Sequence, residues 1–89
     1  MSQFQKLRDL LEKNYNWPAL YTFKFIIPNE KEVEFKRIME IDVVVKSYKV
    51  RPSGQGKYLG FTFSISCEST DHVIRIYEKA ITIVGVISL

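Results

Sequence analysis

An alternating stretch in the second half of the chain constrains the fold more than any other feature. Apolar residues and small or polar residues alternate without a break over residues 58–67. The apolar set is Leu59, Phe61, Phe63, Ile65 and Cys67, and the other set is Tyr58, Gly60, Thr62, Ser64 and Ser66. Because successive side chains of a strand point to opposite faces of a sheet, the pattern predicts a strand with one buried face and one open face.

A turn is predicted directly before this strand. Residues 52–56 read Pro-Ser-Gly-Gln-Gly, and proline and glycine together allow the chain to reverse without strain. The apolar run over residues 43–50 is the predicted partner strand, so the two strands form a hairpin with a longer loop. Lys46 and Lys49 are typical of an edge strand, where charge discourages stray pairing.

Helical and extended patterns account for the rest of the chain. Helices are predicted over residues 2–15, 29–41 and 69–84, and further strands over residues 20–27 and 86–89. Ser2 is the expected cap of the first helix, and Asn29, with Glu32 reaching back, is the expected cap of the second. Trp17 is expected to anchor the first helix onto the domain.

The order of these elements predicts the fold class, which is α+β. After the first helix the order is β-α-β-β-α-β, and two helices can cover only one face of a four-stranded antiparallel sheet. With right-handed crossovers this gives a ferredoxin-like sandwich whose first and third strands are central. We therefore expect an N-terminal helix and connection over residues 1–18 and a ferredoxin-like domain over residues 19–89.

Composition narrows the classes of function. The 89 residues indicate one domain. The net charge of +3 is smaller than the positive charge expected of a dedicated nucleic-acid-binding protein. A single cysteine, Cys67, excludes an internal disulfide framework, and with no signal peptide in view it predicts a cytoplasmic setting. No apolar run approaches the roughly 18–20 residues of a membrane span, so we expect no membrane association.

The hairpin carries the candidate site. Four cations lie on it or on its strands: Lys46, Lys49, Arg51 and Lys57. The turn adds Ser53, Gly54 and Gly56, whose backbone N–H groups can bind anions, and Tyr58 follows them. We predict that this basic hairpin and the open sheet face bind a small anionic ligand or an acidic protein partner. The alternative is a solvated turn with ordinary charges.

No set of residues indicates catalysis. His72 has no second histidine or cysteine near it in the sequence, so we expect neither a metal site nor a cofactor, and we predict that the protein is not an enzyme. The run Gly60-Phe61-Thr62-Phe63 is partly similar to an RNA-recognition strand, although Leu59 stands where that motif has a cation. Weak RNA binding through the open face is therefore the alternative function, and self-association as a homodimer is a further expectation.

Several segments are similar to a known family. Among them are F-K-F-I-I-P at residues 23–28, R-P-S-G-Q-G-K-Y at residues 51–58, the strand that follows, and the terminal G-V-I-S-L. Together they resemble the YbeD-like family of small bacterial proteins of uncharacterised function, over roughly Tyr21 to Leu89. The resemblance implies a ferredoxin-like fold, similar to that of the ACT regulatory domains, and no catalytic activity.

Overall fold

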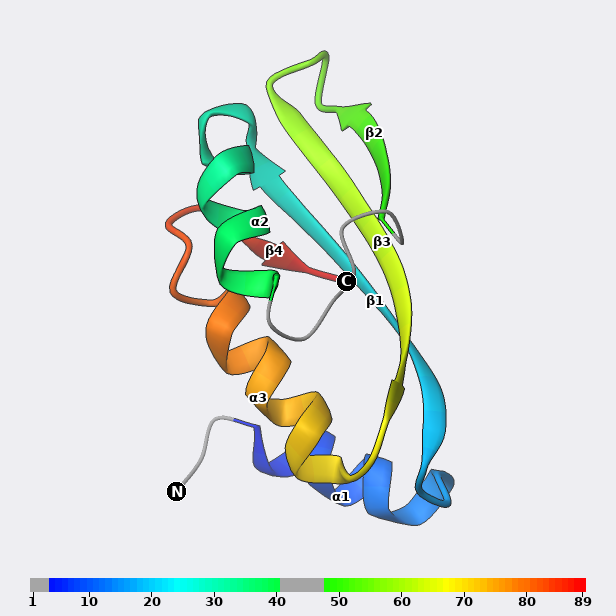
Figure 1. Cartoon of the computed structure of the whole chain (residues 1–89). Coiled ribbons are helices and arrows are strands. Elements are labelled where there is room, and N and C mark those ends of the chain that lie inside the picture. The colour runs from blue at the N-terminus through cyan, green and yellow to red at the C-terminus, as the bar shows by residue number, and fades with distance from the viewer. Residues whose placement is uncertain (1–3, 41–47) are drawn as a thin grey trace.

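Helices and strands alternate along most of the chain (Figure 1). The structure, a computed structural model, describes residues 4–40 and 48–89. Its elements are α1 (Gln5–Asn14), β1 (Ala19–Pro28), a short 3-10 helix (Asn29–Lys31), α2 (Glu32–Met39), β2 (Lys49–Ser53), β3 (Tyr58–Cys67), α3 (Thr70–Ala80) and β4 (Ile87–Ser88).

The four strands form one antiparallel sheet in the order β2-β3-β1-β4. β1 and β3 pair along their whole length, from Ala19 opposite Cys67 to Pro28 opposite Tyr58. The first and third strands are therefore central, as the sequence predicts. The protein is of the α+β class, with a four-stranded antiparallel sheet and three α-helices in the described residues.

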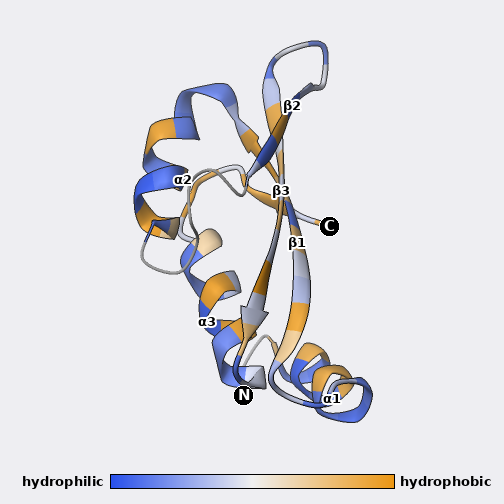
Figure 2. Ribbon diagram, turned by 45° about the vertical axis from the view of Figure 1, so that its right-hand side comes forward, coloured by the Kyte–Doolittle hydropathy of each residue, from blue (hydrophilic) through white to orange (hydrophobic). Residues whose placement is uncertain are grey.

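The helices leave one face of the sheet uncovered. In Figures 1 and 2, α2 and α3 both lie on the same side of the sheet. The helix α1 lies across the end of the sheet where β1 begins and β3 ends (Figure 1). The opposite side, here called the open face, carries the alternate residues of each strand.

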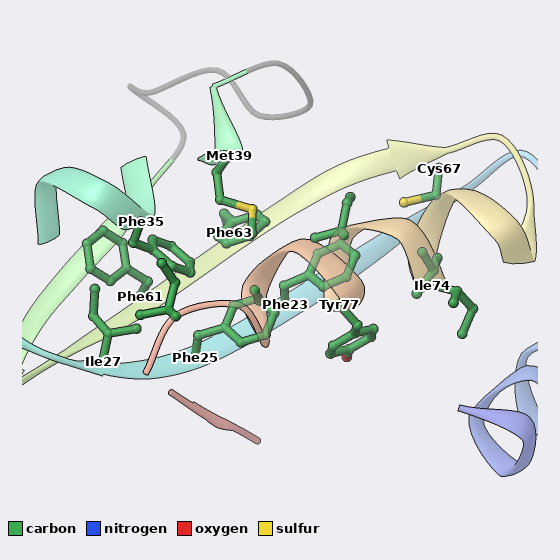
Figure 3. Close-up of a cluster of buried hydrophobic side chains, with 14 of the residues drawn as sticks. Phe23, Phe25, Ile27, Phe35, Met39, Phe61, Phe63, Cys67, Ile74 and Tyr77 are labelled. Carbon is green, nitrogen blue, oxygen red and sulfur yellow. The ribbon is translucent and has the colours of Figure 1, made fainter. Parts of the chain in front are cut away.

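Aromatic side chains dominate the core between the sheet and the helices (Figure 3). Phe61 and Phe63 of β3 are 0% and 2% exposed, so the predicted inward parity of that strand is confirmed. The ring centroids of Phe35 and Phe61 are 4.8 Å apart, and those of Phe23 and Phe63 are 5.3 Å apart. These contacts join α2, β3 and β1 into one apolar layer.

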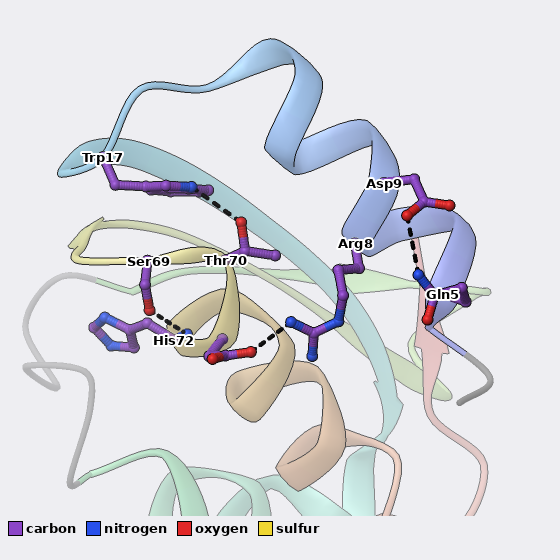
Figure 4. Close-up of polar contacts among 8 residues, drawn as sticks. Gln5, Arg8, Asp9, Trp17, Ser69, Thr70 and His72 are labelled. Carbon is purple, nitrogen blue, oxygen red and sulfur yellow. Dashed lines mark hydrogen bonds and ion pairs between the residues drawn. The ribbon is translucent and has the colours of Figure 1, made fainter. Parts of the chain in front are cut away.

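Trp17 ties the N-terminal helix to the rest of the domain, as predicted. Its indole Nε1–H donates to the hydroxyl of Thr70 over 3.0 Å (Figure 4). Its ring stacks on that of Tyr15, with centroids 5.3 Å apart. Arg8 of α1 pairs with Asp71 at the start of α3, and Leu11 is buried in the core. The helix α1 therefore shares the packing of the domain.

The prediction that Asn29 caps the second helix is wrong. Asn29 begins the 3-10 helix, and α2 follows it without a side-chain cap. The Asn29 N–H donates to the carbonyl of Lys57 over 3.1 Å, and its amide Nδ2 donates to the carbonyl of Gly56. Glu32 does not reach back either, because it accepts from Lys36 Nζ over 3.0 Å. The Asn29 side chain, which was expected to cap the helix, is hydrogen-bonded to the hairpin turn instead.

The third helix begins as predicted but ends earlier. Ser69 caps it, accepting from the His72 N–H over 3.1 Å. The helix ends at Ala80, and Ile81 and Val84, expected on its buried stripe, are 42% and 76% exposed. After Ala80 the chain forms a turn, and Ile83 is the residue of this segment that is buried.

The second strand ends later than predicted. In the described residues β2 covers Lys49–Ser53, so it includes Pro52, and the turn is confined to residues 54–57. Proline is tolerated there because β2 is an edge strand and needs no donor on its outer side. The last strand is also shorter, at Ile87–Ser88. The helix α2 ends at Met39, close to the end expected near Ile41. The expectations for Ser2 and for residues 43–47 lie outside the described residues.

Truncating one side chain on each face of the sheet tests which face is buried. We expect Phe63→Ala to lower the free energy of unfolding by about 3–5 kcal/mol, because it leaves a cavity in the core. We expect Leu20→Ala, at a site 69% exposed on the open face, to change it by less than about 0.5 kcal/mol. Urea unfolding followed by circular dichroism measures both, and comparable losses would contradict the assignment of faces.

Alkaline pH probes the packing of Tyr48, whose ring lies edge-on to Phe61 and Phe63. Its hydroxyl is buried with no hydrogen-bond partner among the described residues, and burial, reinforced by the charge of Glu40, raises its pKa to about 12. In the unfolded chain the Tyr48 hydroxyl ionises near pH 10, whereas in the folded protein it stays protonated to a higher pH. This difference lowers the free energy of unfolding as the pH rises above about 10. We expect Tyr48→Phe to reduce the loss of stability between about pH 10 and 12, measured by urea unfolding. An unchanged pH dependence would contradict this.

Candidate functional site

The strand register arranges the middle of the open face in two rows that cross the sheet. The first row runs from Arg51 on β2 through Gly60 on β3 and Ile26 on β1 to Ile87 on β4. The second row runs from Lys49 through Thr62 and Lys24 to Leu89, whose N–H donates to the Lys24 carbonyl over 3.0 Å. Directly opposed residues of antiparallel strands point to the same face, so each row forms a continuous strip of side chains.

A hollow of about 370 Å³ lies over these two rows. Its lining consists of Lys24, Phe25, Ile26, Lys49, Arg51, Pro52, Ser53, Gly60, Phe61, Thr62 and Leu89. Gly60 leaves room at the centre of the floor, because it has no side chain on the open face. A Cβ placed there would meet its nearest neighbour, the carbonyl oxygen of Arg51, at 3.7 Å. This is ordinary contact distance, so the backbone does not require glycine at this position.

The lining of the hollow is positively charged. Lys24, Lys49 and Arg51 all line it, and no carboxylate side chain of the described residues does so. The described ion pairs involve other cations, namely Arg8, Lys31 and Lys36. Because like-charged side chains held close together raise the local potential, this part of the open face favours anions.

Hydroxyl groups continue the hollow along the open face. A smaller hollow of about 210 Å³ adjoins the first, sharing Lys49 and Thr62 with it and extending to Ser64. The Ser64 hydroxyl lies 2.6 Å from that of Thr22 on the neighbouring strand. These groups offer hydrogen bonds next to the cations, as a binding site for a polar group needs.

The structure divides the candidate residues predicted on the hairpin into two groups. Lys49, Arg51 and Ser53 line the hollow over the rows. Gly56, Lys57 and Tyr58 line a separate, wide depression beside Asn29 and Glu30. Lys46 lies outside the described residues. Lys57 is therefore not in the lining of the same hollow as Lys49 and Arg51.

The turn has fewer available N–H groups than the sequence suggested. Gly54, Gln55 and Gly56 all have positive φ, between 55° and 85°. The N–H of Gly56 donates to Ser53, and the N–H of Lys57 donates to Gly54. Gly54 also lies against the ring of Tyr58, where a Cβ would come within 2.8 Å of Cδ2. The glycines thus serve the turn itself, and the cations of β2 form the better candidate for anion binding.

Sequence reasoning missed the residues that complete the hollow. Lys24 was not among the predicted site residues, and Ile26 and Leu89 were not considered for the site. The available signal was the parity of β1, which puts Lys24 and Ile26 on the same face. Only the pairing of β1 with β3 and β4 shows that they lie beside Gly60, Thr62 and Leu89.

Other candidate chemistry has structural roles. Phe61 and Phe63 are buried, so they offer no surface on which bases could stack. His72 lies in the first turn of α3, where its Nδ1 accepts from the Glu68 N–H over 3.1 Å. Cys67 is buried at the end of β3. The described residues contain no group of three or more acidic, histidine or cysteine side chains that could hold a metal ion. None of the helices in this part of the chain is long and apolar enough to cross a membrane.

Comparison with known proteins identifies the family. The family model described as "Protein of unknown function (DUF493)" matches residues 12–87, which run from α1 into β4. No curated protein and no solved structure matches the chain. The YbeD-like family that the sequence resembles is this same family of small uncharacterised bacterial proteins, so the resemblance is confirmed. The chain belongs to the DUF493 family.

Proposed function

We propose that this protein is a non-enzymatic binding module that holds a small anionic ligand on the open face of its sheet. The observation that carries the proposal is the hollow over Gly60, which three cationic side chains line and no carboxylate side chain of the described residues lines. Arginine binds phosphate and carboxylate groups with two parallel hydrogen bonds, and lysine adds a compact charge. Lys24, Lys49 and Arg51 are exposed, and their positions follow from strand pairing.

The size and rigidity of the site support a small ligand. A volume of about 370 Å³ is within the range of pockets that bind small molecules. The floor of the hollow belongs to β1 and β3, which are paired over their whole length and backed by the aromatic core. A site built on strands is held more precisely than one built on a loop, so less order has to be gained on binding.

The same arrangement supports a finer assignment of the fold. We propose that the domain is the ferredoxin-like sandwich, in which two split β-α-β units place their first strands side by side. The strand order β2-β3-β1-β4 and the position of α2 and α3 on one side of the sheet support it. A regulatory role of the ACT type and a cytoplasmic setting stay predictions that rest on the resemblance and on the single cysteine.

The alternative partners differ in how they use the open face. RNA binding would have to proceed without Phe61 and Phe63, because both rings are in the core. An acidic protein surface would use the exposed cations but would have no need of the hollow. A small anion uses both, so it is the function that the geometry favours. Homodimer formation is compatible with it and stays a prediction.

A titration with pyrophosphate tests the proposal. We expect pyrophosphate to shift the amide resonances of Lys24, Gly60 and Thr62 in nitrogen–proton NMR spectra. We expect Lys49→Ala with Arg51→Ala to weaken binding at least about tenfold, because two of the three charges are removed. Both residues are exposed on the edge strand β2, so the double variant should fold.

Two controls keep the test specific. Lys6→Ala with Lys13→Ala removes the same net charge from exposed positions of α1 and should leave the affinity unchanged. Lys57→Ala measures whether the cation of the turn, which lies outside the hollow, contributes to the affinity. Equal losses in the α1 variant would show that only net charge matters, and an unchanged affinity in the β2 variant would refute the site. A single-stranded RNA that binds more tightly than pyrophosphate, with steep salt dependence, would favour the RNA alternative.

A further inference from the structure

The two rows of the open face are charged at one end and apolar at the other. On the β2 side they end in Arg51 and Lys49, and on the β4 side they end in Ile87 and Leu89. We propose, on the basis of the proposed function, that the ligand is an organic phosphate. Its phosphate contacts Arg51 and Lys49, and its flat apolar group lies over Gly60 toward Ile26 and Leu89.

The charged end suits a phosphate group. Lys49 and Arg51 are two residues apart on β2, so their side chains project from the open face beside each other. Lys24 lines the same hollow from β1. A phosphate monoester carries nearly two negative charges at neutral pH and three acceptor oxygens. Several cations can therefore contact it together, whereas a single carboxylate satisfies fewer of them.

The apolar end lacks a partner in the described chain. Ile87 is 50% exposed and Leu89 is 70% exposed. Both belong to the rows of the open face, and α2 and α3 lie on the other side of the sheet (Figure 1). Ile26 lies next to Ile87 in the same row. Adjacent exposed apolar side chains next to a charged hollow mark a surface that gains free energy when an apolar group covers it.

Gly60 connects the two ends. A glycine inside a strand weakens it and often marks a close approach by another group. The backbone here does not need glycine, because a Cβ would meet no atom closer than 3.7 Å. What glycine does provide is a flat stretch of backbone between the cations and the apolar residues. A planar ring can lie on that backbone, and any side chain at residue 60 would occupy the same space.

Comparing phenyl phosphate with inorganic phosphate tests this assignment. Both probes offer the charged group, and only phenyl phosphate offers the ring. We expect phenyl phosphate to bind about tenfold more tightly to the full chain, which corresponds to covering roughly 60 Å² of apolar surface. NMR titrations measure both affinities, and the amides of Gly60 and Ile26 should respond to the ring.

Two variants locate the ring. Gly60→Val places a branched side chain in the floor, and valine suits a strand. Leu89→Ser trims the apolar end at an exposed position. We expect each to remove most of the advantage of phenyl phosphate and to leave the binding of inorganic phosphate unchanged. If Gly60→Val does not fold, Leu89→Ser decides the question.

The outcomes separate this inference from the proposed function. Equal affinities of the two phosphates, or an advantage of phenyl phosphate that survives both variants, would overturn the organic phosphate and leave the anion site standing. If neither pyrophosphate nor inorganic phosphate depends on Lys49 and Arg51, the proposed function itself fails.

Discussion

The pairing of β1 with β3 determines where every other part of this protein lies. The two strands are opposed from Ala19 and Cys67 at one end to Pro28 and Tyr58 at the other. Because side chains alternate between faces, a shift of one residue would expose the phenylalanines of one strand and bury its polar residues. The aromatic core makes that shift costly, since Phe23 and Phe25 on β1 pack with Phe63 on β3.

The same pairing builds the candidate site. When Phe25 and Phe61 are opposed on the buried side, Lys24 and Thr62 are opposed on the open side. The core and the hollow are therefore two consequences of one register. A small domain can therefore hold several cations on a rigid surface, because the residues next to these cations in sequence make the stabilising contacts on the other face of the sheet.

Parity within a strand and the start of a helix could be predicted from the sequence. The buried face of β3 and the start of α3 next to Ser69 depend only on neighbours in the chain, and both were predicted correctly. The role of Asn29 was not, because its side chain had a choice between the free N–H groups of a helix and the carbonyl of Gly56, which is distant in sequence. Local preference cannot decide between a local partner and a distant one.

The sequence by itself determined which residues of each strand are buried, because alternation is a property of the chain. It also determined that cations gather near the hairpin. Only the tertiary structure decided which of them share a surface: Lys24 lies with Lys49 and Arg51 across the sheet, while Lys57 lies at the turn. The physical reason is that the lateral order of strands depends on hydrogen bonds between distant segments, and those bonds leave no periodic signal in the sequence.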